Sequence, residues 1–477
     1  MIPLSSVILV ILGTLGIFAF HIEVYFPIWL SVAILVGVTW YLFSLYRAGW
    51  IGVLILVLWA VYAMPFIHIP PYLWYDFSTV PSRLWGLTSN PYNTDKEIVS
   101  LTAMLGAVGG LGVAFGVSLN TIRLEYDNGR TLYAARRQIT TIAFPVWLTW
   151  VAVGVLLSWL ATPSETIFTA SYTHSQSTLD SANFDSAWMM SYVILTFALN
   201  DALLETDPVS KNLKRKIIFF TVALLVVVFQ MLRGNRESFS WVFGIAIVYY
   251  YWAAGYIHGA EKRVPWMKLG LWVLMLLVFA MVVGNLRSAL TGADITVASE
   301  MAVGLFQSRA DEDVKLLDGT WSGALLTPLS VAGDHVNHML AIKWGKDYID
   351  YLLSLPPGFI ADAIGYVRPI SRNVGPAWEM RYGGGGTHAV VLPFMNFRMA
   401  GVFFIPALWA YVCSQYERLA VKKVSVTNLS LLVVLVMASP HWLWYGEKNV
   451  LNAFILWLIF SLFYRISKGG MRSHMLS

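Results

Sequence analysis

Charged residues are scarce in this chain of 477 residues: 12% are charged, while 57% are hydrophobic. A typical soluble domain has about 25% charged residues, so this chain lacks the polar residues that would cover soluble domains of its size. The same composition excludes a disordered or a collagen-like chain. The class that remains is a membrane protein that crosses the bilayer several times.

Cysteine is nearly absent too. The single cysteine, Cys413, cannot form an internal disulfide or supply a cysteine metal cluster. A Gly-x-Ser-x-Gly turn, a Walker-type phosphate loop and a His-Glu-x-x-His motif are also missing. The net charge of +5 is too small and too dispersed to indicate nucleic acid binding. A mechanism that uses cytoplasmic ATP or a nucleotide sugar is therefore disfavoured.

Long apolar runs predict about twelve transmembrane helices, because about 20 mostly apolar residues cross a bilayer. The predicted spans are 4–22, 25–46, 49–69, 98–118, 140–161, 187–205, 217–232, 238–258, 269–286, 389–411, 428–444 and 449–465. The expected fold is all-α. Spans one to nine occupy 1–286, a large and partly helical loop occupies 287–388, and spans ten to twelve with a C-terminal tail occupy 389–477.

Charge decides the expected orientation. One set of short connections and the C-terminal tail hold 18 of the 32 basic residues, whereas 20 of the 27 acidic residues belong to the opposite side. The positive-inside rule then predicts that both termini are cytoplasmic and that the loop 287–388 lies outside. The polar chemistry is expected on that outer face.

Glycines within 98–118 indicate close helix packing. Gly112 and Gly116 are four residues apart, a spacing that lets a neighbouring helix approach. A phosphate-binding role is disfavoured because no strand precedes them.

The outer loop is longer than most structureless connections, which indicates a functional segment. Residues 322–344 are predicted to be helical despite Pro328, and the mixed segment 347–360 suits a short helix at the membrane interface. The alternative is a purely structural cap on the helix bundle.

The loop ends in four glycines, Gly383 to Gly386, followed by Thr387 and His388 at the start of span ten. Such a backbone can approach a ligand closely, and the unperturbed pKa of a histidine such as His388 suits general base catalysis. The alternative is a flexible turn with an interfacial histidine.

Several arginines are expected at the outer boundary, where guanidinium groups could bind phosphate oxygens bidentately. Arg233 and Arg236 lie in a very short hairpin beside a helix N-terminus, which adds free N–H donors. Arg287 ends span nine, and the loop adds Arg372 and Arg381. The alternative is that single arginines only extend to lipid headgroups.

Two further polar groups suit a cavity that holds water or substrate; for Arg398, structural pairing with an acid is the equal alternative. Arg398 follows His388 by ten residues, which in a continuous helix places it near the bilayer centre, with Asn396 nearby. Asp334 precedes His335 and His338, which are expected on one helical face. A metal site is disfavoured there, because a third ligand is missing.

Together these features resemble the Wzy-type polymerases of bacterial O-antigen and exopolysaccharide repeat units and, more distantly, the O-antigen ligases. The resemblance covers the twelve-span plan, the large loop between spans nine and ten, Arg233-Gly-Asn-Arg236, Arg287, and the segment Gly-Gly-Thr-His388 to Asn396-Phe-Arg398-Met-Ala-Gly401. The family often has glycine where Arg398 stands.

The resemblance implies a metal-independent glycosyltransferase of the GT-C type, without cofactor, in the bacterial inner membrane. It would join oligosaccharide units carried on undecaprenyl pyrophosphate at the periplasmic face, and a separate chain-length regulator is a candidate partner. Arg233, Arg236, Arg287, Arg372 and Arg381 would hold the pyrophosphate. His388 would be the base, with Glu379, Glu237 and Asp334 as competitors, and His335, His338, Asn396 and Arg398 would line the substrate cavity.

Other classes remain open. An O-antigen ligase would use a similar plan, although ligases usually carry a His-Asn-rich motif where this loop ends Thr387-His388-Ala389. A flippase or another transporter is expected to show paired repeats and broken helices. A membrane scaffold would leave the clustered arginines unexplained.

Overall fold

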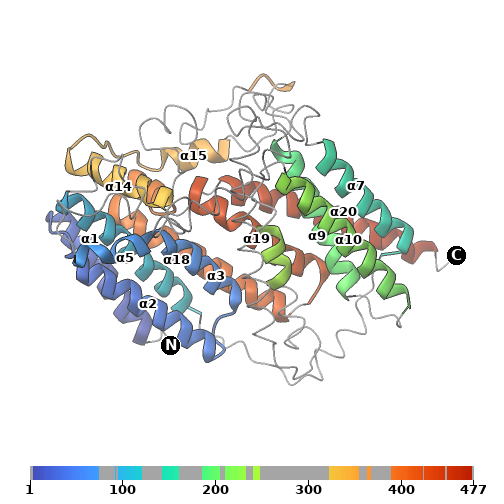
Figure 1. Cartoon of the computed structure of the whole chain (residues 1–477), viewed down its shortest axis with the longest axis horizontal. Helices are drawn as coiled ribbons and strands as arrows, with labels where there is room; N and C mark the ends of the chain where they lie inside the picture. The colour runs from blue at the N-terminus through green and yellow to red at the C-terminus, as the bar shows by residue number, and fades with distance from the viewer. Residues whose placement is uncertain are drawn as a thin grey trace, which may run out of the picture. The chain divides into compact units, whose positions relative to one another are not determined.

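The apolar runs form helices in the computed structural model (Figure 1). The structure describes residues 4–74, 92, 95–120, 142–160, 185–204, 210–232, 240–247, 322–353, 363–366, 388–422, 424–445 and 448–474. Within these residues, every regular element is a helix, which confirms the all-α prediction for this part of the chain.

Five of the described helices are long and apolar enough to cross a membrane. They are α1 (Leu4–His21), α2 (Ile28–Arg47), α5 (Lys96–Ser118), the segment Val391–Ala420 of α18 (Val391–Lys422), and the segment Val450–Lys468 of α20 (Lys448–His474). This composition is that of an α-helical membrane protein with several spans. The total of twelve spans stays a prediction.

The other described helices follow the predicted segments, with ends that are shifted by up to eight residues. They are α3 (Val53–Ala63) with the 3-10 turns η1 (Met64–His68) and η2 (Pro70–Leu73), α7 (Phe144–Leu160), α9 (Asp185–Leu204), α10 (Ser210–Leu232), α14 (Ser322–Val336), α15 (Lys346–Leu353) and α19 (Val426–Tyr445). The predicted span 269–286 lies outside the described residues, and only 240–247 of the span 238–258 is described.

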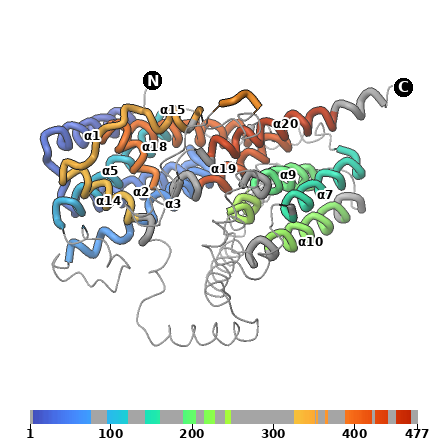
Figure 2. Tube along the Cα trace, turned by 90° about the horizontal axis from the view of Figure 1, so that it is seen from above, coloured from blue at the N-terminus to red at the C-terminus, as the bar shows by residue number. Residues whose placement is uncertain are grey.

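The chain divides into two compact units, of which the first comprises Met1–Glu125, Val314–Arg418 and Ser439–Val450. Helix α5 is its centre: it packs against α1, α2, α3 and α14 (Figures 1 and 2), and nearly all of its side chains are buried. The Asp95 carboxylate accepts hydrogen bonds from the N–H groups of Glu97 and Ile98, at 2.9 and 3.2 Å, and so caps the start of α5.

The close helix packing predicted from the glycines of α5 is confirmed. A Cβ atom added to Gly112 would collide with the Phe403 carbonyl oxygen, and one added to Gly116 with the Ala407 carbonyl oxygen, both on α18. Only glycine therefore permits this backbone-to-backbone approach.

A second anchor of this unit is Glu417, near the other end of α18. Its buried carboxylate accepts hydrogen bonds from the N–H groups of Gly52, at 3.0 Å, and Leu54, at 2.7 Å, where α3 begins. A carboxylate at a helix N-terminus accepts hydrogen bonds from free N–H donors and interacts favourably with the positive end of the helix dipole. Glu417 thus ties α3 to α18.

The second unit comprises Tyr126–Asp313, Leu419–Ala438 and Leu451–Ser477, and its helices α7, α9 and α10 pack against one another. A buried ion pair joins them: Arg215 donates from Nη1 to Asp201 Oδ2 at 2.9 Å, and from Nη2 to the Ile142 carbonyl at 2.9 Å. Asp201 also accepts hydrogen bonds from the Ile142 N–H and the Tyr464 hydroxyl. This network fixes Ile142, which lies shortly before the start of α7.

Candidate functional site

The described polar cluster lies at a break in α18. Arg398 has φ 53° and ψ −148°, a backbone conformation that is close to one found essentially only in glycine. A Cβ atom added to Gly401 would collide with the Pro393 carbonyl oxygen, because the chain bends back on itself at the break. The continuous helix assumed at Arg398 is therefore wrong, whereas the depth of Arg398 in the bilayer stays a prediction.

The chain between α14 and α15 packs onto this break. The Lys343 N–H donates to the Met395 carbonyl at 3.1 Å, which satisfies an acceptor that the interrupted helix leaves free. Arg398 donates from Nη2 to the Leu340 carbonyl at 2.6 Å. A segment of the long loop is thereby fixed against the first turns of α18.

The Arg398 guanidinium is half-buried and lies 5.5 Å from the centre of the Phe394 ring. Its Nη1 atom is buried and has no hydrogen-bond partner. Among the described residues, no carboxylate forms an ion pair with it. The cationic side chain is thus held by a carbonyl and an aromatic ring, and no carboxylate in the described part of the chain neutralises its charge.

Asn396, two residues earlier, forms a pair of hydrogen bonds with Asp347. Its amide Nδ2 donates to Asp347 Oδ2 at 2.8 Å, and its Oδ1 accepts from the Asp347 N–H at 3.3 Å. Lys343 completes the group with an ion pair of 3.1 Å to Asp347. The sequence analysis predicted that Asn396 lines a substrate cavity. Here the side chain is fully buried and serves to fix the start of α15.

The two histidines that were expected on one helical face are separated. Helix α14 ends at Val336, earlier than the predicted 344, and His338 has a left-handed φ of 56°. The Met339 N–H bonds to the Asp334 carbonyl and the His338 N–H to the His335 carbonyl, which is the hydrogen-bond pattern of a Schellman cap. The shared-face prediction is wrong because this cap ends the helix between them.

His335 nevertheless joins the Arg398 cluster. Its ring stacks on Phe20 at 5.0 Å and meets Phe394 edge-on at 5.5 Å, so it shares the Phe394 ring with Arg398. Burial, followed by the charges of Arg398 and His338, lowers the pKa of His335 to about 4. The imidazole is therefore neutral near pH 7. Asp334 is buried and His338 is exposed.

His388 lies in a different environment from the Arg398 cluster. Its ring is buried between Tyr62 and Phe66, its Nε2–H donates to the Tyr62 carbonyl at 3.1 Å, and its Nδ1 accepts from the Val390 N–H at 3.3 Å. Burial lowers its pKa to about 4, although the bond to the Tyr62 carbonyl opposes this shift. In this arrangement neither nitrogen is free to accept a proton from a substrate hydroxyl.

The remaining predicted site residues lie outside the described residues. They are the five expected pyrophosphate-binding arginines Arg233, Arg236, Arg287, Arg372 and Arg381, and the candidate bases Glu237 and Glu379. The sequence analysis did not assign Lys343, Asp347 or Phe20 to the site. An acid and a lysine four residues apart are common on solvated helices, and nothing in their spacing indicated a partner on α18.

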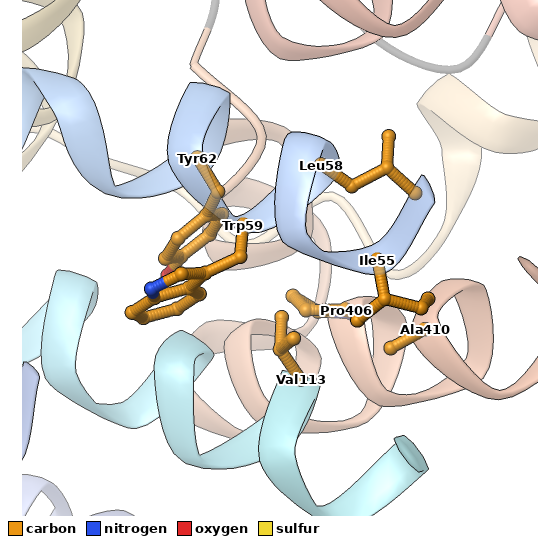
Figure 3. Close-up of a pocket in the computed structure, with 7 residues that line it drawn as sticks. All are labelled: Ile55, Leu58, Trp59, Tyr62, Val113, Pro406 and Ala410. Carbon is orange, nitrogen blue, oxygen red and sulfur yellow. The ribbon is translucent and has the colours of Figure 1, made fainter. Parts of the chain in front are cut away.

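A small cavity of about 20 Å³ lies between α3, α5 and α18 (Figure 3). Its lining consists of Ile55, Leu58, Trp59, Tyr62, Val113, Pro406 and Ala410. The space is close to that of one water molecule and the walls are almost wholly apolar. It is too small for a sugar, so we regard it as a packing defect beside Pro406.

No known protein family, no curated protein and no solved structure matches this chain.

Proposed function

We propose that this protein is a glycosyltransferase of lipid-linked oligosaccharides, which polymerises repeat units carried on undecaprenyl pyrophosphate into O-antigen or a related surface polysaccharide. The observation that carries the proposal is Arg398. A cation that forms no ion pair with any carboxylate of the described residues is held on a broken membrane helix and is covered by part of the long loop. Such a charge is costly in an apolar membrane helix, and charged residues at such positions are usually functional.

The chemistry explains why cations would be needed at this place. The acceptor is one repeat unit, and its non-reducing-end hydroxyl attacks the anomeric carbon of the donor chain. A new C–O bond forms, the bond between the anomeric carbon and the phosphate oxygen breaks, and undecaprenyl pyrophosphate leaves. Fixed cations stabilise the charge that develops on the leaving group, and a base takes the hydroxyl proton.

The residue roles follow from the sequence. Arg233, Arg236, Arg287, Arg372 and Arg381 are proposed to bind pyrophosphate. Asp334, Glu237, Glu379 and His388 are the proposed candidates for the base. For His388 this role requires that the 3.3 Å bond from the Val390 N–H to Nδ1 opens when substrate binds.

The proposal includes a setting: twelve spans in a bacterial inner membrane, both termini in the cytoplasm, and the site on the periplasmic face. The described helices support a membrane protein with several spans. The distribution of basic residues along the sequence supports cytoplasmic termini and an outer site.

The test is the lipopolysaccharide gel profile of a clean deletion in the host, complemented with the parent, His388→Ala or Arg236→Ala. We expect core plus one repeat in the deletion, and loss of long chains in both variants at normal membrane abundance. Removal of a base typically costs about 10²–10⁴-fold, and loss of Arg236 would remove a cation that stabilises the leaving pyrophosphate. Normal ladders in both variants would remove these two assignments. Bare core with accumulated lipid-linked polymer in the deletion would show that the protein is a ligase and not a polymerase. An unchanged profile in the deletion, with normal exported polysaccharides, would contradict both.

A further inference from the structure

Helix α15 has its polar side turned inward and its apolar side turned outward. Asp347 is buried against Asn396, whereas Ile349, Leu352 and Leu353 are 56%, 57% and 46% exposed. At 100° per residue, these three residues lie on the face of the helix opposite to Asp347. The neighbouring turn adds Trp344, which is 75% exposed. A helix of this kind is typical of a protein that rests on lipid.

The Arg398 site lies under the same segment. Leu340, just before Trp344, accepts the Arg398 Nη2–H, and Asn396 on α18 holds Asp347 on α15. The apolar surface and the Arg398 cation are therefore two parts of one local structure. A single ligand that contacts both would have an apolar chain and an anionic head.

The backbone at Arg398 adds a second argument. A non-glycine residue at φ 53° and ψ −148° costs on the order of 1–3 kcal/mol. Glycine would avoid this cost, so the arginine side chain must contribute something that glycine cannot. Its buried Nη1 atom still lacks an acceptor, and phosphate oxygens are the acceptors that the guanidinium fork fits best.

We propose that Arg398 binds a phosphate of a prenyl pyrophosphate, and that the prenyl chain lies along the apolar surface of Trp344, Ile349, Leu352 and Leu353. The half-buried guanidinium supplies a charge-assisted hydrogen bond to the phosphate. The identity of the lipid rests on the proposed function. The anion site itself rests on the geometry of α18.

The test is binding of tritiated farnesyl pyrophosphate to the full chain in phosphatidylcholine nanodiscs. We expect Arg398→Gln and Arg398→Gly to weaken binding about tenfold or more, as loss of a charge-assisted hydrogen bond would. Arg47→Gln is the matched control, because it removes an exposed arginine at the end of α2, and should change the affinity less than about twofold.

Arg398→Gly also separates binding from folding, because it relieves the strained backbone. It should melt at a temperature no lower than Arg398→Gln and still bind poorly. Parent-like affinity in a folded Arg398→Gly protein would overturn the proposal.

Two further arms identify the ligand. Leu352→Ser should weaken binding of farnesyl pyrophosphate but leave competition by inorganic pyrophosphate unchanged, since only the chain touches that residue. An equal loss of both, or no loss of either, would contradict the apolar surface. Displacement by phosphatidylglycerol at comparable concentration would assign the site to lipid headgroups in general and overturn the prenyl assignment.

The two proposals fail in different ways. Intact prenyl pyrophosphate binding by Arg398 with an unchanged polysaccharide profile in the deletion would refute the polymerase alone. A polymerase phenotype with unaltered binding in Arg398→Gln would refute the anion site alone.

Discussion

The contact between α5 and α18 gives the sharpest stability prediction. A Cβ atom at Gly116 would lie 2.8 Å from the Ala407 carbonyl carbon and 3.0 Å from its Cα, closer than an ordinary contact of about 3.4 Å or more. Gly112 meets the Phe403 carbonyl in the same way. The neighbours are backbone atoms, so they cannot turn aside as a flexible side chain can.

The magnitude follows from two opposing terms. Overpacking typically costs about 1–3 kcal/mol, and a backbone clash belongs in the upper half of that range. Alanine gains up to about 1 kcal/mol over glycine in helix propensity. We therefore expect Gly116→Ala to destabilise by about 1–2 kcal/mol. The double change with Gly112→Ala should cost less than twice that, because one shift of α18 relieves both clashes.

The chain carries its own reporter of this contact. Cys413 is the single cysteine, lies on α18 and is buried. A thiol-reactive fluorogenic dye will therefore report the opening of α18 as purified protein is heated in detergent. We expect Tm to fall by several degrees in Gly116→Ala and further in the double variant.

Gly37 provides the control. It lies within α2 and has no atom within 4 Å of its built Cβ, so Gly37→Ala should leave Tm unchanged or slightly raised. If Gly116→Ala and the double variant have the same Tm as Gly37→Ala and the parent, the backbone contact does not exist as described.

Two further predictions concern buried ionisable groups. Asp201→Asn should destabilise the second unit by about 3–5 kcal/mol because it leaves Arg215 charged and buried, and Asp201→Asn with Arg215→Met should recover much of the loss; equal melting of the single and double variants by circular dichroism would disprove the ion pair. His388 has a folded pKa of about 4 against about 6.5 unfolded, so stability is full above pH 6.5 and falls by up to about 3 kcal/mol as the pH drops to 4. His388→Phe should lose this part of the acid sensitivity in melting curves at pH 7 and pH 5, and an identical pH response in both proteins would argue against a neutral buried imidazole.

The sequence by itself determined that helices form and where. Apolar runs of about 20 residues cross a bilayer as helices, since a backbone in lipid must satisfy its own hydrogen bonds within the segment. Composition therefore sufficed for α1, α2 and α5, and glycine spacing sufficed for the close approach at Gly112 and Gly116. The short helix α15 was likewise predicted from its mixture of acidic and apolar residues.

Only the tertiary structure decided the polar site. Sequence periodicity treats α18 as one helix, but the break at Arg398 depends on contacts from Leu340 and Lys343, more than fifty residues away. The same is true of His388. Its motif suggested a base, but burial beside Tyr62 and Phe66 lowers its pKa to about 4, and hydrogen bonds occupy both of its nitrogens. Side-chain chemistry is local, but desolvation and hydrogen-bond partners are set by chain segments that only folding brings together.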